Sequence, residues 1–164
     1  MDERTELGPC ARADLRDALR RQVTETVVDG ARIITGGRDV DGPGFYFAPT
    51  VVADVVRGMP MFDEETFGPA AAVTPVKDDD EAVAVANDSQ FGLGANIWTR
   101  DVDHAARLAS RLEAGMVFVN GMVASDPRLP FGGVKRSGYG RELSAFGIHE
   151  FVNVQTLWIG PERS

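Results

Sequence analysis

The sequence is poor in the residues that build disulfides and zinc sites, with one cysteine and two histidines among 164 residues. Cys10 alone cannot form an internal disulfide, and two histidines without a second cysteine are a poor set of zinc ligands. No apolar run approaches the roughly 20 residues of a membrane-spanning helix, and the acidic start of the chain lacks the basic and apolar regions of a secretory signal. We therefore expect a cytoplasmic protein that binds no metal and no membrane.

Basic residues are also in the minority, because 17 lysines and arginines stand against 25 aspartates and glutamates, a formal net charge of −8. This sign is wrong for holding nucleic-acid phosphates or anionic lipids, so nucleic acid is not an expected partner. Hydrophobic residues at 43% and charged residues at 26% are typical of a globular protein. The length suits one compact domain with its own core.

The first part of the chain predicts one helix followed by extended segments. Leucine and valine recur at four-residue steps over residues 11–29, which is typical of an amphipathic helix, and Gly30 is expected to end it. Short β-prone runs at residues 31–35 and 45–52 flank a polar, glycine-rich turn at 38–44. The apolar side of this helix needs a surface to lie on.

Three short apolar runs in the middle of the chain alternate with two helical segments. We expect strands at residues 70–76, 94–98 and 116–119, and helices at 79–87 and 101–112. This alternation predicts a βαβαβ unit, that is, a parallel sheet with right-handed crossover helices. The predicted fold class is therefore α/β.

The last part of the chain begins with a loop at residues 121–140 that is too rich in glycine and proline for a regular element. A short helix is expected over residues 141–146 and a final strand over 151–159, with both faces of that strand partly apolar. An isolated strand of this kind would expose unpaired backbone N–H and C=O groups together with apolar side chains. We therefore expect it to pair with another sheet or subunit.

Two polar segments are candidates for a functional site, but spacing alone supports neither. The glycine-rich loop at residues 132–140 fits neither a phosphate-binding P-loop nor the dinucleotide fingerprint, which favours a structural loop. Glu64 and Glu65 are neighbours in sequence, and neighbouring acids rarely converge as a general acid and base, so solvated side chains are favoured. His104 and His149 have no nucleophile or metal ligand at a useful spacing, and we expect them to be structural.

Four motifs follow one another along the chain: EETFGP at residues 64–69, ANDSQFGL at 86–93, FVN at 118–120 and PFGGVKRSGYGRE at 130–142. In content, order and separation they resemble the C-terminal portion of the NAD(P)-dependent aldehyde dehydrogenases. The resemblance extends over essentially the whole chain. Residues 124–129 and 146–151 are similar to those of bacterial succinate-semialdehyde dehydrogenases.

This resemblance implies a domain division, a cofactor and partners. Residues 1–148 would be the C-terminal part of the catalytic domain, and residues 149–164 would be an oligomerisation strand and tail. The cofactor would be NAD or NADP, and the substrate a small aldehyde, with succinate semialdehyde implied by the subfamily. The expected protein partner is another copy of the chain, or a full-length or N-terminal aldehyde dehydrogenase chain.

The resemblance also assigns roles to individual residues. Glu65 matches the glutamate that hydrogen-bonds the nicotinamide ribose, and Phe67 matches the aromatic ring beside the nicotinamide. Phe131 resembles the aromatic residue that lines the aldehyde tunnel. Ser125 lies where succinate-semialdehyde enzymes bind the distal carboxylate, and Arg128 is a candidate to neutralise that carboxylate.

The family's cysteine nucleophile, its water-activating glutamate and its dinucleotide-binding fold all precede the region present here. Cys10 lies where the family has an ordinary apolar residue, so we expect no catalytic residue in this chain and no activity from it alone. Two alternatives stay open. The chain is a non-catalytic interaction or oligomerisation module, or it is a truncated remnant that docks through its last strand.

Overall fold

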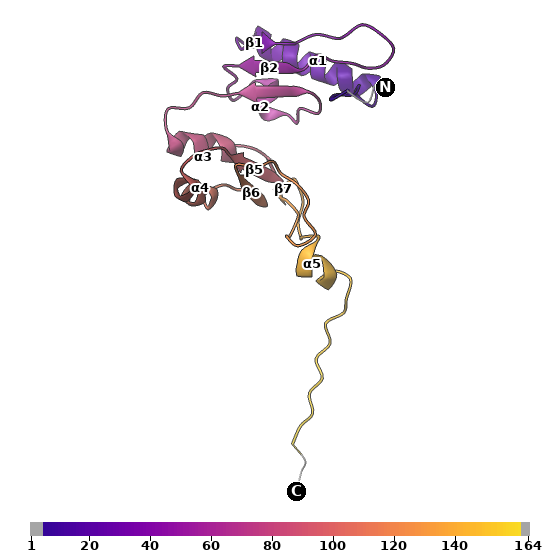
Figure 1. Cartoon of the computed structure of the whole chain (residues 1–164), viewed down its shortest axis with the longest axis vertical. Helices are drawn as coiled ribbons and strands as arrows, with labels where there is room; N and C mark the ends of the chain where they lie inside the picture. The colour runs from indigo at the N-terminus through magenta and orange to yellow at the C-terminus, as the bar shows by residue number, and fades with distance from the viewer. Residues whose placement is uncertain (1–4, 162–164) are drawn as a thin grey trace. The chain divides into compact units, whose positions relative to one another are not determined.

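The computed structural model describes residues 5–161 and divides into two compact units, one up to Lys77 and one from Asp78 onward (Figure 1). This differs from the single compact domain that the chain length predicted. The physical reason is that each part closes hydrogen-bonded sheets of its own, so that neither depends on the other to pair the strands assigned to it.

The first unit consists of two helices and a three-stranded sheet. Its elements are α1 (Ala13–Val28), β1 (Arg32–Thr35), β2 (Thr50–Ala53), α2 (Pro60–Asp63) and β3 (Ala70–Val73). The strand order is β1-β2-β3, with β1 antiparallel and β3 parallel to the central strand β2. Figure 1 shows α1 running alongside this sheet.

The core of the first unit forms where one face of α1 packs on the sheet and on α2. Leu19 and Val23 are each 1% exposed, and Val52 of β2 is fully buried against them. Burial of side chains of this size contributes about 1.5–3 kcal/mol each. The predicted amphipathic helix is confirmed, and it ends as expected at Gly30, whose φ of 112° is one that glycine adopts without strain.

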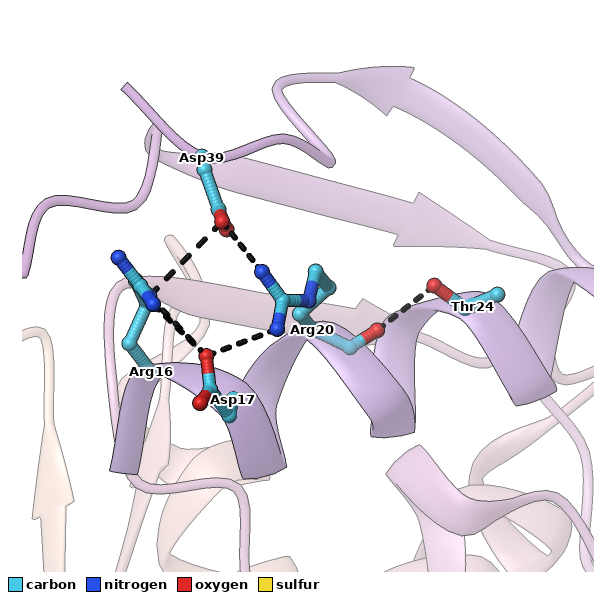
Figure 2. A network of polar contacts seen from close by, with 5 residues as sticks. All are labelled: Arg16, Asp17, Arg20, Thr24 and Asp39. Carbon is cyan, nitrogen blue, oxygen red and sulfur yellow. Dashed lines mark hydrogen bonds and ion pairs between the residues drawn. The ribbon is translucent and has the colours of Figure 1, made fainter. Parts of the chain in front are cut away.

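A cluster of charged residues on α1 holds the loop between β1 and β2. Arg16 and Arg20 lie one turn apart, and both reach the Asp39 carboxylate, while Asp17 bridges the two arginines from the helix side (Figure 2). In the same view Thr24 donates a hydrogen bond to the Arg20 carbonyl, 2.8 Å away. Exposed ion pairs contribute little one by one, so the cluster chiefly sets where this loop crosses the helix.

The part of the second unit that the structure describes contains three helices and two short sheets. Its elements are α3 (Asp79–Asn87), β4 (Phe91–Gly92), β5 (Gly94–Ile97), α4 (Val102–Ala109), β6 (Met116–Val119), β7 (Val134–Lys135) and α5 (Ser144–His149). β5 and β6 are parallel, with α4 as the connection between them, and β4 pairs antiparallel with β7. Asp78 and Asp101 cap the first turns of α3 and α4 by accepting hydrogen bonds from backbone N–H groups.

The α/β fold class is confirmed, and two details differ from expectation. The strand predicted at residues 70–76 is β3, which pairs in parallel with β2, whereas β5 pairs with β6 and not with β3, so the parallel βαβ connection within the described residues is β5-α4-β6. The final strand predicted over residues 151–159 is not formed, because residues 153–160 have no regular secondary structure. A strand requires a neighbouring edge to supply its hydrogen bonds, and none of the described residues supplies one to this segment.

No helix within residues 5–161 is long and apolar enough to span a membrane.

Candidate functional site

The EETFGP segment at residues 64–69 is a loop that is tied at both ends. The short helix α2 starts with a proline in its first turn and stops at Glu64, whose backbone is extended. At the other end, the Pro69 carbonyl accepts a hydrogen bond of 2.9 Å from the Thr50 amide of β2, directly before β3 begins. The residues between these anchors are therefore held in a defined position.

The back of this loop lies against α1. A Cβ atom added to Gly68 would come within 2.6 Å of a Leu19 methyl carbon, in the centre of the core. About two helical turns further along the same face, Thr26 is fully buried and its hydroxyl accepts a hydrogen bond of 3.0 Å from the Met61 amide of α2. The loop and the helix that leads into it are thus both positioned by α1.

Glu64 is held by two side chains of α1. The Arg21 guanidinium donates to the Glu64 carboxylate at 2.6 Å, and the Gln22 amide donates to the same oxygen at 3.0 Å. The hydrogen bond from Arg21 is the main cause that lowers the pKa of Glu64, and the hydrogen bond from Gln22 is the second. Glu64 is therefore a structural residue that stays charged at neutral pH.

Glu65, the next residue, differs from Glu64 because only its main chain is bound by α1. Its backbone carbonyl accepts the second hydrogen bond of the Gln22 amide, at 3.0 Å. Its side chain is exposed, and within residues 5–161 no hydrogen bond or ion pair engages its carboxylate. The structure thus separates the two adjacent acids into one that anchors the loop and one whose acceptor oxygens are available.

Phe67 extends the available surface of the loop with an aromatic ring that is 66% exposed. The ring borders an open hollow of about 290 Å³, together with Cys10 and Leu15. Cys10 is half-buried, and its backbone N–H donates to the Phe45 carbonyl at 2.9 Å. None of the described residues that line this hollow is acidic or basic.

The ion pair at Glu64 predicts an acid-dependent loss of stability. Because the folded state lowers the pKa of Glu64 from its ordinary value of 4.5, the contribution is complete above that pH and is lost as the pH falls through the folded value. Since the side chain is 43% exposed, we expect Glu64→Gln to cost less than about 1 kcal/mol at about pH 7, and still less at about pH 3. Urea unfolding followed by the NMR signals of β2 amides measures this, and a difference that is independent of pH would contradict it.

In the second unit, Phe131 is held at the start of the glycine-rich loop by two backbone hydrogen bonds with Glu142, both 2.8 Å long. The half-buried ring borders two open hollows, of about 920 Å³ and 680 Å³. Arg141 borders both as well, and its guanidinium donates to the carbonyls of Gly133 and Gly140 at 2.9 and 2.6 Å. Phe131 is therefore placed on a closed turn beside apolar space.

The remaining part of the glycine-rich loop binds backbone groups of its own unit. The Lys135 ammonium donates to the carbonyls of Asn87 and Ser89 at 2.7 and 3.0 Å. The Ser137 hydroxyl accepts from the Gly92 amide of β4 at 3.0 Å. These contacts support the interpretation of residues 132–140 as a structural loop rather than a phosphate cradle.

Arg128 already has a carboxylate partner in its own loop. Its guanidinium binds Asp126 through two hydrogen bonds of 2.9 and 2.6 Å, and its backbone N–H donates to the same carboxylate at 2.9 Å. The hydrogen bond from the Arg128 side chain is the main cause that lowers the pKa of Asp126. Ser125 next to this pair is exposed.

Sequence reasoning placed Glu65 and Phe67 in one loop of the first unit, and Ser125, Arg128 and Phe131 in a second loop of the other unit. It missed Gln22 and Asp126. A signal existed for Gln22, because it is a polar residue on the buried face of an amphipathic helix. Among the described residues, no group of histidine, cysteine, aspartate and glutamate side chains could hold a metal ion.

Comparison with known proteins shows relatives over nearly the whole chain. The succinate semialdehyde dehydrogenase (NAD(P)+) Sad of Escherichia coli strain K12 is 55% identical over 157 residues, which are 96% of this chain and 34% of that protein. The succinate-semialdehyde dehydrogenase (NADP(+)) 1 of Mycobacterium ulcerans is 48% identical over 159 residues, which are 97% of this chain and 35% of that protein. The chain thus spans about a third of the length of these relatives.

Solved structures and a family model agree with these relatives. The succinic semialdehyde dehydrogenase of Streptococcus pyogenes, solved in complex with NADP+ as the cofactor, matches with a TM-score of 0.93 and 39% identity, covering 98% of this chain and 35% of that one. A protein named Gox0499, studied for cofactor and substrate selection, matches with a TM-score of 0.93 and 42% identity, covering 97% of this chain and 35% of that one. The family model described as aldehyde dehydrogenase family matches residues 1–157. The chain belongs to the aldehyde dehydrogenase family.

Proposed function

We propose that this chain supplies the C-terminal part of an NAD(P)-dependent aldehyde dehydrogenase that oxidises succinate semialdehyde to the acid. The observation that carries the proposal is the state of the EETFGP loop. Glu64 is bound by Arg21 and Gln22, whereas the neighbouring Glu65 carboxylate has no partner among residues 5–161. An anchored loop with one free carboxylate suits a binding site better than two solvated acids do.

The residues present fit a nicotinamide ribose. A free carboxylate can accept hydrogen bonds from two neighbouring sugar hydroxyls, and such charge-assisted bonds are stronger than neutral ones. The exposed Phe67 ring beside it offers an apolar wall that excludes water from a bound ring. When bound, NAD(P)+ supplies a hydride acceptor. Glu65 and Phe67 orient it, and the cysteine nucleophile belongs to another part of the enzyme.

We assign aldehyde-binding contacts to three residues of the second unit: Phe131, Ser125 and Arg128. Phe131 borders apolar space on a closed turn, which suits the methylene groups of the substrate. The exposed Ser125 hydroxyl is available to hydrogen-bond a distal carboxylate. The Arg128 guanidinium binds Asp126 through Nε and Nη2, which leaves its Nη1 donors for a substrate carboxylate.

Residues 1–148 are in this proposal the C-terminal part of the catalytic domain, and residues 149–164 are a strand and tail that pair with another chain. Support comes from the exposed apolar side chains after α5. Phe151 is 92% exposed, Val154 91% and Trp158 82%. Exposed apolar side chains in this number mark an interaction surface.

The experiment uses a chimera in which this chain replaces the matching C-terminal third of Escherichia coli Sad, with which it is 55% identical over 157 residues. We expect the Sad chimera to form NAD(P)H with succinate semialdehyde, and the isolated chain to form none. A folded but inactive chimera would contradict the proposal. Activity of the isolated chain that Cys10→Ser abolishes would show that the nucleophile lies here after all.

A second candidate function, a non-catalytic oligomerisation module, is favoured by the same exposed segment after α5. Gel filtration of the chain with and without Sad tests it. A stable complex between the two, together with an inactive chimera, would support the module. If the chain elutes as a monomer both with and without Sad, the result contradicts the oligomerisation module.

A further inference from the structure

Gln22 is a buried polar residue in a position that the helix otherwise gives to the core. It lies on the face of α1 that also carries Leu19 and Val23, and it is 5% exposed. Burying an amide costs free energy unless its hydrogen-bonding groups find partners. An apolar side chain at this position would avoid the free-energy cost of burying the Gln22 amide, so the presence of glutamine needs an explanation from its hydrogen bonds.

Both hydrogen bonds that the amide nitrogen donates go to the acid pair. Gln22 Nε2 donates to Glu64 Oε2 and to the backbone carbonyl of Glu65, each at 3.0 Å. Arg21, the preceding residue of α1, donates to the same Glu64 oxygen at 2.6 Å. One helix thus holds the side chain of Glu64 and the main chain of Glu65.

The hydrogen bond from Gln22 holds the Glu65 main chain without touching its carboxylate. With its carbonyl oxygen bound to a buried amide, the Glu65 peptide group cannot rotate freely. The carboxylate itself has no partner among residues 5–161. The ordering of the Glu65 backbone is thus already complete before any ligand arrives, which reduces the entropy lost on binding.

We propose that Gln22 is a positioning residue for Glu65, acting through the Glu64–Glu65 main chain with Arg21 as its support. The inference rests on the proposed function, because it takes Glu65 as the contact to the nicotinamide ribose. Only a side chain with two donors in a fork can hold both oxygens. Methionine fills a similar volume and donates nothing, so Gln22→Met removes the fork with little change in packing.

The first test measures the mobility of the loop in the full chain by NMR relaxation, without any ligand. In the wild-type chain we expect a backbone order parameter at Glu65 of about 0.85, as in rigid structure, and in Gln22→Met a value below about 0.6. Arg21→Met is the second variant. It removes an exposed side chain, so folding is not at risk, and a smaller decrease is expected. Arg12→Met, which removes an exposed arginine at the start of α1, is the matched control and should change nothing.

The second test separates positioning from general stability in the Sad chimera. We expect Gln22→Met to lower kcat/KM for NADP+ about tenfold, and to have little further effect when Glu65→Ala is already present. A merely structural role would lower activity by the same factor in both backgrounds.

The outcomes distinguish this inference from the proposed function. A loop that stays rigid in Gln22→Met, or losses that multiply in the double variant, would overturn the positioning role even in an active chimera. A third outcome combines two results: the loop becomes mobile in the Gln22→Met variant of the isolated chain, and Glu65→Ala leaves the activity of the chimera unchanged. This outcome would support the anchoring by Gln22 and contradict the nicotinamide contact.

Discussion

Replacing Glu65 by alanine in the Sad chimera is expected to lower kcat/KM for NADP+ about 100-fold. The free carboxylate accepts two hydrogen bonds in the proposed complex, and a hydrogen bond to a charged group contributes about 1.5–3 kcal/mol. Loss of about 3 kcal/mol corresponds to roughly two factors of ten. Steady-state kinetics at saturating succinate semialdehyde, with NADP+ and with NAD+, measures the effect.

Two further variants make the Glu65 result specific. Glu65→Gln keeps one acceptor oxygen and loses the charge, so an intermediate decrease of about tenfold is expected. Asp41→Ala removes an exposed carboxylate from the glycine-rich turn of the same unit, and its kinetics should match those of the unmodified chimera. If Glu65→Ala behaves like Asp41→Ala, Glu65 does not contact the cofactor.

Replacing Gly115 by alanine is expected to destabilise the second unit by about 2–4 kcal/mol. Gly115 lies between α4 and β6, and its N–H donates to the Gly92 carbonyl of β4 at 3.0 Å. An added Cβ would come within 2.9 Å of Gly133 Cα and still closer to the Gly132 carbonyl oxygen. Backbone cannot yield as a flexible side chain does, so the loop that carries Phe131 would be displaced.

Urea unfolding followed by tryptophan fluorescence reports on this change, because both tryptophans, Trp98 and Trp158, lie in the second unit. Gly121→Ala is the matched control, since its added Cβ would meet nothing closer than a backbone oxygen at 4.0 Å. We expect it to be within about 0.5 kcal/mol of the wild-type chain. Equal stabilities of the Gly115 and Gly121 variants would show that the loop accommodates the methyl group.

Much of the secondary structure could be predicted from local patterns. The four-residue steps of α1, the acidic first turn of α3 and the apolar side of α4 are each complete within one segment, and the helices lie where these patterns indicated. The four motifs of residues 64–142 likewise indicated the family, because each is a contiguous run of letters. Such features need no knowledge of which segments lie side by side.

Pairings between distant segments could not be predicted in the same way. The partner of β3 is β2, seventeen or more residues earlier in the chain, and nothing in the composition of either strand singles out the other. The segment at 151–159 has the pattern of a strand, yet residues 153–160 form none, because strand formation depends on an edge that the pattern cannot supply. Arg128 is predicted to meet a substrate carboxylate, and its ion pair with Asp126, two residues away, is a contact that the sequence pattern did not indicate.

The sequence by itself determined the family, the α/β fold class and which loops carry the candidate contacts, because these depend on residue types and their order along the chain. The resemblance pointed to Glu65 rather than Glu64, but only the tertiary structure shows the physical difference between the two adjacent glutamates, one bound and one available. That difference depends on Gln22 and Arg21, more than 40 residues away in sequence, whose donors reach Glu64 but leave the Glu65 carboxylate free. Hydrogen bonds select partners by distance and direction in space, and two neighbouring acids are chemically identical until the chain has folded around them.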